Sequence, residues 1–147
     1  MSFIQRKKFL FKKKYNELTG WANQGVLLLN TSLTFEKKED KKLQQQSQNY
    51  NLKLWKPFIN HIIKKLLETK DRPVVMFLWG DKAQKLVENN LKNAELQDNI
   101  LILKSTHPSP LSVNRGGDFP ILAPQHFKLC NEFLEKYSIK PIKWDKL

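Results

Sequence analysis

The sequence predicts an α/β fold, in which a parallel sheet is flanked by helices on both sides. Three apolar runs, residues 26–29, 74–79 and 100–103, are bounded by turn-forming or polar residues, as strands buried on both faces are. Helical patterns lie between and after these runs, and strands that alternate with helices form right-handed crossovers in a parallel sheet. A chain of 147 residues is long enough for one such domain with its own core.

Residues 1–18 form a basic N-terminal segment, and over residues 1–19 interspersed apolar residues give a pattern that loosely fits an amphipathic helix. No apolar stretch is long enough for a signal peptide or a membrane span, so we expect a cytoplasmic protein. The single cysteine, Cys130, excludes an internal disulfide and a cysteine-based metal cluster, suits a reducing compartment and is expected in the core.

The first strand is bounded by Gly25 and Asn30. The stretch 36–51 is rich in Lys, Gln and Asn, and we expect a mobile loop there because it has few apolar residues to bury. From Leu52 apolar residues recur at three- and four-residue spacing, which predicts a helix with Pro57 in its first turn. His61 lies between the apolar positions of this helix and is expected at or near its surface.

After the strand at 74–79, Asp81 suits the N-cap of a helix that continues to Leu91. A final helix is predicted from about Pro124 to Tyr137. The tail 140–147 contains Trp144 and is expected to pack back in extended form.

The stretch Ser105-Thr106-His107-Pro108-Ser109-Pro110-Leu111-Ser112 follows the strand that begins at residue 100. Its two prolines cannot donate to a sheet and restrict the residues before them, so they predict a stiff loop. This loop lies at the carboxyl edge of the sheet, where open α/β folds bind their ligands. Three strand ends, at Asn30, at Gly80-Asp81 and at His107, should therefore meet in one site.

The charge of the chain allows two interpretations of equal weight. Lysine and arginine number 26 against 14 acidic residues, a formal net charge of +12. Such an excess favours a polyanionic partner, nucleic acid first, but it also fits the lysine-rich composition of an AT-rich genome. A nucleotide-binding α/β domain is disfavoured because the chain has no glycine-rich phosphate loop.

The sequence resembles the family 1 uracil-DNA glycosylases in five segments, which occur in the family's order from about residue 19 to the end. They are Gly20-Trp21-Ala22-Asn23-Gln24-Gly25-Val26-Leu27-Leu28-Leu29-Asn30, Leu78-Trp79-Gly80 with Ala83-Gln84-Lys85, His107-Pro108-Ser109-Pro110-Leu111-Ser112 with Arg115-Gly116, His126-Phe127, and Lys140-Pro141-Ile142-Lys143-Trp144. The resemblance implies hydrolysis of the N-glycosidic bond of uracil in DNA during base-excision repair, with neither metal nor cofactor.

The resemblance also implies roles for individual residues. Asn30 would read the flipped uracil through its amide. His107 would hydrogen-bond the uracil oxygen on which negative charge develops, and Leu111 would fill the vacated base stack. The remaining residues implied to contact DNA near the extruded nucleotide are Gly80, Asp81, Pro108, Ser109, Pro110, Ser112 and Arg115. Taken singly, Asn30 is also a turn former, His107 a loop histidine and Leu111 an ordinary core residue.

The chain departs from the family in ways that bear on catalysis. It has no Gly-Gln-Asp-Pro-Tyr-His segment, which carries the family's water-activating aspartate, nor the later segment with the phenylalanine that stacks on uracil. In the family the strand before that aspartate lies between the strands that match residues 25–30 and 74–79. We therefore expect residues 19–147 to be a partial domain, the C-terminal two thirds of the enzyme with its first, central strand missing.

A partial domain leaves several functional interpretations open. A separate chain that supplies the missing N-terminal segment would complete the site. The alternatives are one half of a split enzyme and a non-catalytic basic DNA-binding remnant, whose gapped sheet would expose edges and apolar surface and favour aggregation. Asp81 stands where the family commonly has serine; its carboxylate would repel a DNA phosphate, and it is the less favoured candidate for activating water.

Overall fold

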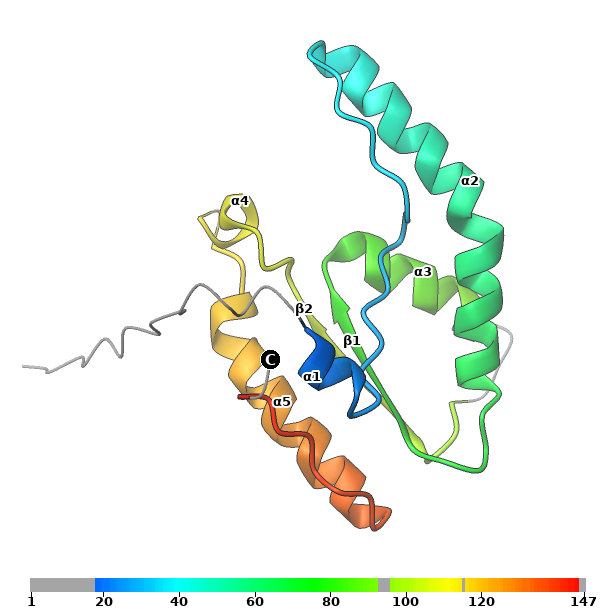
Figure 1. The fold of residues 1–147 in the computed structure, drawn as a ribbon, viewed down its shortest axis with the longest axis vertical. Coiled ribbons are helices and arrows are strands. Elements are labelled where there is room, and N and C mark those ends of the chain that lie inside the picture. Colours follow the sequence, from blue (N-terminus) through cyan, green and yellow to red (C-terminus); the bar gives the residue numbers. More distant parts are fainter. Residues whose placement is uncertain (1–17, 93–95, 115, 146–147) are drawn as a thin grey trace, which may run out of the picture. The chain divides into compact units, whose positions relative to one another are not determined.

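The computed structural model describes residues 18–92, 96–114 and 116–145 (Figure 1). The helix expected in residues 1–18 therefore lies outside the described residues, apart from Leu18. The elements in chain order are α1 (Thr19–Ala22), α2 (Lys41–Leu67), β1 (Val74–Trp79), α3 (Asp81–Leu91), β2 (Ile100–Ser105), α4 (Pro110–Val113) and α5 (Phe119–Lys136). The chain divides into two compact units, residues 1–28 with 142–147 and residues 29–141.

The smaller unit joins α1 to the C-terminal tail. The ring of Trp21 packs edge to face on Trp144, with centroids 5.4 Å apart, and its Nε1 donates to the carbonyl oxygen of Trp144 at 3.1 Å. The side chain of Gln24 bonds both main-chain groups of Lys143, accepting from its N–H at 2.7 Å and donating to its carbonyl at 3.3 Å. These contacts confirm that the tail packs back on an earlier part of the chain.

The larger unit contains a parallel sheet of β1 and β2, paired in register from Val74 opposite Ile100 to Trp79 opposite Ser105. Because side chains alternate along a strand, β1 presents different residues to its two faces. Met76 and Leu78 join the buried cluster that β1 forms with α2, α3 and β2, which also holds Ile59, Ile63, Leu67, Val87 and Ile100. Phe77 and Trp79 pack on α5 through Phe127, at centroid distances of 5.7 and 6.2 Å. The predicted α/β fold, a parallel sheet with helices on both faces, is confirmed.

The prediction of a strand at residues 26–29 is wrong. This run has no regular secondary structure, and the described sheet consists of β1 and β2 alone. Leu27 and Leu28 are 63% and 55% exposed, whereas Leu29 packs on the buried cluster. A strand requires a neighbour that takes up its main-chain hydrogen bonds, and within the described residues no strand pairs with this run.

The prediction of a loop over residues 36–51 is also wrong, because α2 begins at Lys41. Pro57 lies inside this helix, whereas the sequence predicted it in the first turn. Asp40 is the N-cap and accepts a hydrogen bond from the N–H of Leu43 at 2.8 Å. Lys and Gln have high helix propensity, so a capped start extends the helix well before its buried part. His61 is exposed, as expected.

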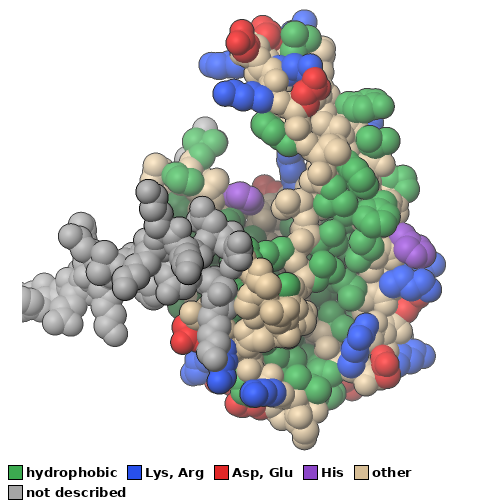
Figure 2. All heavy atoms as spheres, viewed as in Figure 1, with side chains coloured by type: hydrophobic (Ala, Val, Ile, Leu, Met, Phe, Trp, Pro, Cys, Tyr) green, Lys and Arg blue, Asp and Glu red, His purple; other side chains and the backbone are tan. Residues whose placement is uncertain are grey.

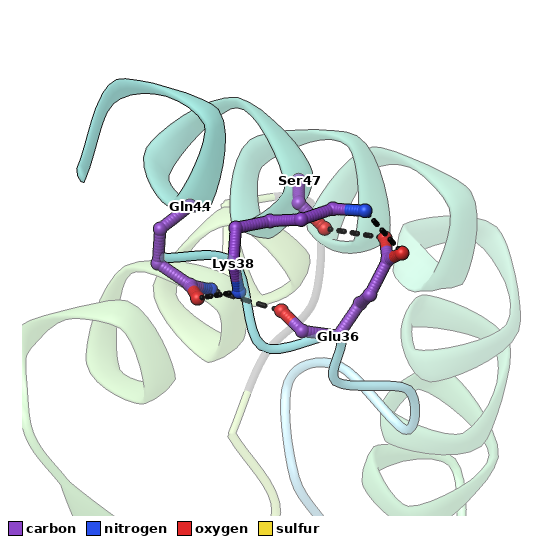
Figure 3. A network of polar contacts seen from close by, with 4 residues as sticks. All are labelled: Glu36, Lys38, Gln44 and Ser47. Atoms are coloured by element: carbon purple, nitrogen blue, oxygen red, sulfur yellow. Dashed lines mark hydrogen bonds and ion pairs between the residues drawn. The ribbon is translucent and has the colours of Figure 1, made fainter. Parts of the chain in front are cut away.

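A short segment before α2 is fastened to the start of that helix (Figure 3). The N–H of Lys38 donates to Oε1 of Gln44 at 2.7 Å, and Nε2 of Gln44 donates to the carbonyl oxygen of Glu36 at 3.1 Å. The carboxylate of Glu36 pairs with Lys38 and accepts from Ser47, and these contacts hold its pKa below the usual value. This polar network replaces the apolar contacts that the composition lacks.

The other helix boundaries need smaller corrections. Gly80, not Asp81, is the N-cap of α3, and Asp81 lies in its first turn. α5 begins at Phe119, so Pro124 lies inside the helix, which ends at Lys136. Cys130 is buried, as expected. None of the described helices has the length and hydrophobicity needed to cross a membrane.

Candidate functional site

The carboxyl ends of β1 and β2 are tied together by hydrogen bonds to one carbonyl group. The N–H of Gly80 donates to the carbonyl oxygen of Ser105 at 2.9 Å. Nε2 of Gln84, one turn into α3, donates to the same oxygen at 2.8 Å. The turn after β1 is therefore fixed against the start of the loop after β2.

His107 lies directly against this turn. A Cβ atom placed on Gly80 would be 3.1 Å from Cβ and 3.4 Å from Cδ2 of His107. Gly80 also has φ +97° and ψ 155°, a region that side-chain-bearing residues rarely adopt. The sequence thus needs glycine here for two reasons, and parallel pairing brings Gly80 and His107 together as predicted.

The imidazole of His107 is oriented by its own loop. The N–H of Ser109 donates to Nδ1 of His107 at 3.1 Å, so in the neutral ring the proton lies on Nε2. The residue is exposed. Nε2 is thereby a hydrogen-bond donor that an incoming oxygen atom can reach.

The loop that carries His107 is closed by a latch between Thr106 and Asp118. Oδ1 of Asp118 accepts from the N–H of Thr106 at 2.7 Å, and the hydroxyl of Thr106 accepts from the N–H of Phe119 at 3.0 Å. Hydrogen bonds from the main chain and hydroxyl of Thr106 hold the pKa of Asp118 below its usual value. At Gly117 a Cβ would lie 2.6 Å from Oγ1 of Thr106 and 2.8 Å from the carbonyl oxygen of Ser112, so the latch is tightly packed.

Inside the latched loop the chain forms a helical turn, α4, where the sequence predicted an irregular stiff loop. Ser109 caps it by accepting from the N–H of Ser112 at 3.4 Å, and Pro110 occupies its first position, which suits proline. Pro108 precedes it and is exposed. Leu111 is 63% exposed, so its side chain projects from the loop into solvent.

The third predicted strand end is not hydrogen-bonded to the junction of Gly80 and His107. Asn30 is exposed and lies in the irregular run after Gly25; in the described part of the chain, no hydrogen bond connects its side chain to the Gly80 turn or the His107 loop. Asp81 is exposed in the first turn of α3, where a helix favours a carboxylate. Arg115 lies outside the described residues.

His126 supports the site from the opposite face of the sheet. This buried residue of α5 accepts from Nε1 of Trp79 through Nδ1 at 3.3 Å, and its ring also hydrogen-bonds the main chain of Lys104. Burial lowers the pKa of His126. His126 therefore links α5 to the carboxyl ends of both strands. In the sequence, the only sign of this role is that His126 lies on the apolar face of the last helix. Over the residues that the structure describes, no group of three or more His, Cys, Asp or Glu is placed to hold a metal ion.

Comparison with known proteins gives one consistent result. The family model of the Uracil DNA glycosylase superfamily matches residues 2–135. A uracil-DNA glycosylase of Streptococcus uberis is 37% identical over 134 residues, which are 90% of this chain and 54% of that protein. Proteins of the same name from Christiangramia forsetii and Saccharomyces cerevisiae are 40% and 35% identical, over 86% of this chain and 50% and 34% of their own lengths. The chain thus spans about half, or less, of the curated relatives it matches.

Proposed function

The chain belongs to the uracil DNA glycosylase superfamily, and on this premise we propose that it takes part in hydrolysing the N-glycosidic bond of uracil in DNA. The relatives that it matches are named uracil-DNA glycosylases. The observation that carries the proposal is the placement of His107 against Gly80, where the ends of two parallel strands are tied together.

His107 is the proposed catalytic residue. With Nδ1 occupied by the N–H of Ser109, its Nε2 proton is available to the uracil oxygen that gains negative charge as the bond breaks. One such preorganised donor contributes about 10²–10³ in rate. The latch of Thr106 and Asp118 holds the donor in place before substrate arrives.

The other site residues would bind the nucleotide. The amide of Asn30 has a donor and an acceptor that match one edge of uracil, and Leu111, already exposed, would enter the base stack that the flipped nucleotide leaves. The groups proposed to contact the neighbouring phosphates and sugars are Gly80, Pro108, Ser109, Pro110, Ser112 and Arg115. Asp81 would weaken phosphate binding at its position through like-charge repulsion.

A second segment is proposed to complete the site, supplied by a separate chain. This chain spans about half the length of its relatives. Within the described residues β1 is paired along one side only, and Leu27 and Leu28 are exposed. A strand beside β1 would bring its own carboxyl end to the Gly80 turn, next to His107, where a water-activating carboxylate is needed.

The test measures uracil release from a uracil-containing oligonucleotide by the purified chain. Release is measured with this chain alone and with this chain mixed with the N-terminal half of the Streptococcus uberis relative. His107→Ala and Asn30→Ala are the test variants, Asp81→Asn tests the alternative carboxylate, and His61→Ala, an exposed histidine on α2, is the matched control.

Release that falls about 10²–10³-fold in His107→Ala and stays unchanged in His61→Ala supports the proposed role of His107. Release that requires the added half supports the two-segment site, whereas loss of release in Asp81→Asn alone would contradict it. No release under either condition, with salt-sensitive binding to DNA, would identify the alternative function, a basic DNA-binding module; the net charge of +12 favours that alternative.

A further inference from the structure

The long helix α2 carries a second apolar surface in addition to its buried face. At about 100° per residue, one set of apolar side chains spans a sector of about 80°, centred about 180° from the buried Ile63. This set, here called the outer stripe, consists of Leu43, Tyr50, Leu54 and Phe58, each between 49% and 66% exposed. Figure 2 shows hydrophobic side chains on the surface along α2. Contiguous exposed apolar side chains on one helix face are typical of an interaction site.

The surface beside the outer stripe is held in one conformation. Oγ1 of Thr34 bonds to Oδ1 of Asn51 at 2.9 Å and accepts from Nε1 of Trp55 at 2.8 Å. Together with the network of Glu36, Lys38, Gln44 and Ser47, these bonds fix the segment 34–38 along α2. The helix surface is therefore preorganised for binding.

Lysines line one flank of the outer stripe, opposite the flank where Glu36 is bonded to Ser47 and paired with Lys38. α2 contains six lysines and no acidic residue. Lys42, Lys53 and Lys64 recur every 11 residues, which is about three helical turns, so they form a row beside the stripe. Lys64 already pairs with Glu68 at 3.8 Å; no carboxylate in the described ranges pairs with Lys42 or Lys53.

We propose that the outer stripe of α2 binds an amphipathic helix with an acidic edge from a partner protein. Tyr50, Leu54 and Phe58 are spaced by four residues, the ridge that packs into the groove of another helix. From Leu43 to Phe58 the stripe is about 22 Å long, which matches about 15 residues of helix. Glutamates on the partner's edge would face the lysine row.

Other occupants fit these observations less well. In an antiparallel dimer formed through two copies of the outer stripe, the lysine rows would lie on the same side and would repel each other; in a parallel dimer each row would face a helix without an acidic residue. DNA would satisfy the lysines without needing four exposed apolar side chains. This inference is independent of the proposed glycosylase activity, because none of its residues lies in the proposed site.

The experiment titrates the full chain into a fluorescent synthetic peptide and follows its anisotropy. The peptide, about 18 residues long, places leucines on one helical face and glutamates along one edge of that face; a scrambled peptide of the same composition is the reference. Leu54→Ser and Lys53→Glu are the test variants. Leu129→Ser, an exposed leucine on α5, and Lys85→Glu, an exposed lysine on α3, are the matched controls.

We expect the patterned peptide to bind at least about tenfold more tightly than the scrambled one, and Leu54→Ser to remove that advantage. Lys53→Glu should weaken binding several-fold and reduce its dependence on salt, while both controls bind as the parent does. Equal binding of the two peptides, or equal binding by Leu54→Ser, overturns the proposal. Sedimentation that shows a dimer dissociated by Leu54→Ser, or vesicles of anionic lipid that replace the peptide with the same sensitivity, also overturns it by assigning the stripe to a different occupant.

Discussion

Replacing Gly80 by alanine adds one methyl group where the turn after β1 meets the loop after β2. With φ +97° and ψ 155°, Gly80 lies in a backbone region where other residues are strained by about 1–3 kcal/mol. The new Cβ would also lie 3.1 Å from Cβ of His107, so the two segments must separate by a few tenths of an ångström. The backbone strain and the close contact both destabilise the native packing of the Gly80 turn against His107.

We expect Gly80→Ala to lower the free energy of unfolding by about 1–3 kcal/mol, and the melting temperature by about 2–4 °C for each kcal/mol. The NMR signals of the His107 ring should shift because the ring is displaced. Gly25→Ala is the matched control, since Gly25 has φ +89° but no atom within 4 Å of the added methyl. It should lose stability through backbone strain and leave the His107 signals where they are.

Denaturant unfolding and the imidazole spectrum of both variants therefore test the junction directly. Unchanged His107 signals in Gly80→Ala would refute the close approach of the two loops. Parent-like stability in that variant would refute the strained turn. Either result would remove the geometric basis for assigning His107 to the site.

Three further predictions concern the surroundings of the site. Gly117→Ala should cost about 1–3 kcal/mol in urea unfolding, because its Cβ would lie 2.6 Å from Oγ1 of Thr106. The pKa of His126 is lowered by burial, so the unfolded chain binds the proton more readily; the stability due to neutral His126 is full above pH about 6.5 and is lost below it, by up to about 1.4 kcal/mol per pH unit. His126→Phe should flatten that slope in unfolding measured between pH 7 and pH 5. Burial raises the pKa of Cys130 to about 11, so mass spectrometry should find iodoacetamide labelling of this thiol at pH 7 only after denaturant is added.

Controls separate these effects from general instability. Gly116→Ala places a methyl group in open space at φ +81°, so it tests backbone strain without the clash at Gly117. His61→Phe, which makes the same replacement at an exposed histidine of α2, is the matched control for His126→Phe. Labelling of Cys130 at the rate of a free thiol in the native chain would contradict its burial.

The three apolar runs show that apolar composition predicts burial of a segment but not whether it pairs as a strand. Residues 74–79 and 100–105 were predicted correctly because each run is continuous and each finds the other as a parallel neighbour. The run at 26–29 has the same composition, yet it forms no strand. A run of leucines indicates that a segment can be buried, but pairing depends on which strand lies beside it.

The start of α2 was missed for a different reason. The expectation of a loop depended on the scarcity of apolar residues that a core could use, and the two apolar residues of 41–51, Leu43 and Tyr50, are indeed exposed. Helix formation there relies on the Asp40 cap and on the bonds that Gln44 and Ser47 make to the preceding segment. Such bonds, made by side chains to nearby main-chain and side-chain groups, leave no periodic pattern in a sequence.

The same limit applies to the site. The meeting of Gly80 and His107 follows from parallel strands alone, and their positions could be predicted. Gln84, Asp118 and His126 instead bond to main-chain groups of β2 and the loop after it. Which main-chain group lies within reach of a side chain is settled by the packed backbone, so these three residues could not be assigned in advance.

The latch and the strand junction also differ in how far apart along the chain their partners lie. Asp118 and Thr106 are 12 residues apart, so the entropic cost of closing the loop between them is small. Gln84 and Ser105 are 21 residues apart and meet only when the crossover through α3 has brought two parallel strands together, a slower, non-local event. We therefore expect the segment bearing His107 to form its internal contact before it meets Gly80, and defects in the latch and in the sheet to slow folding at separate steps.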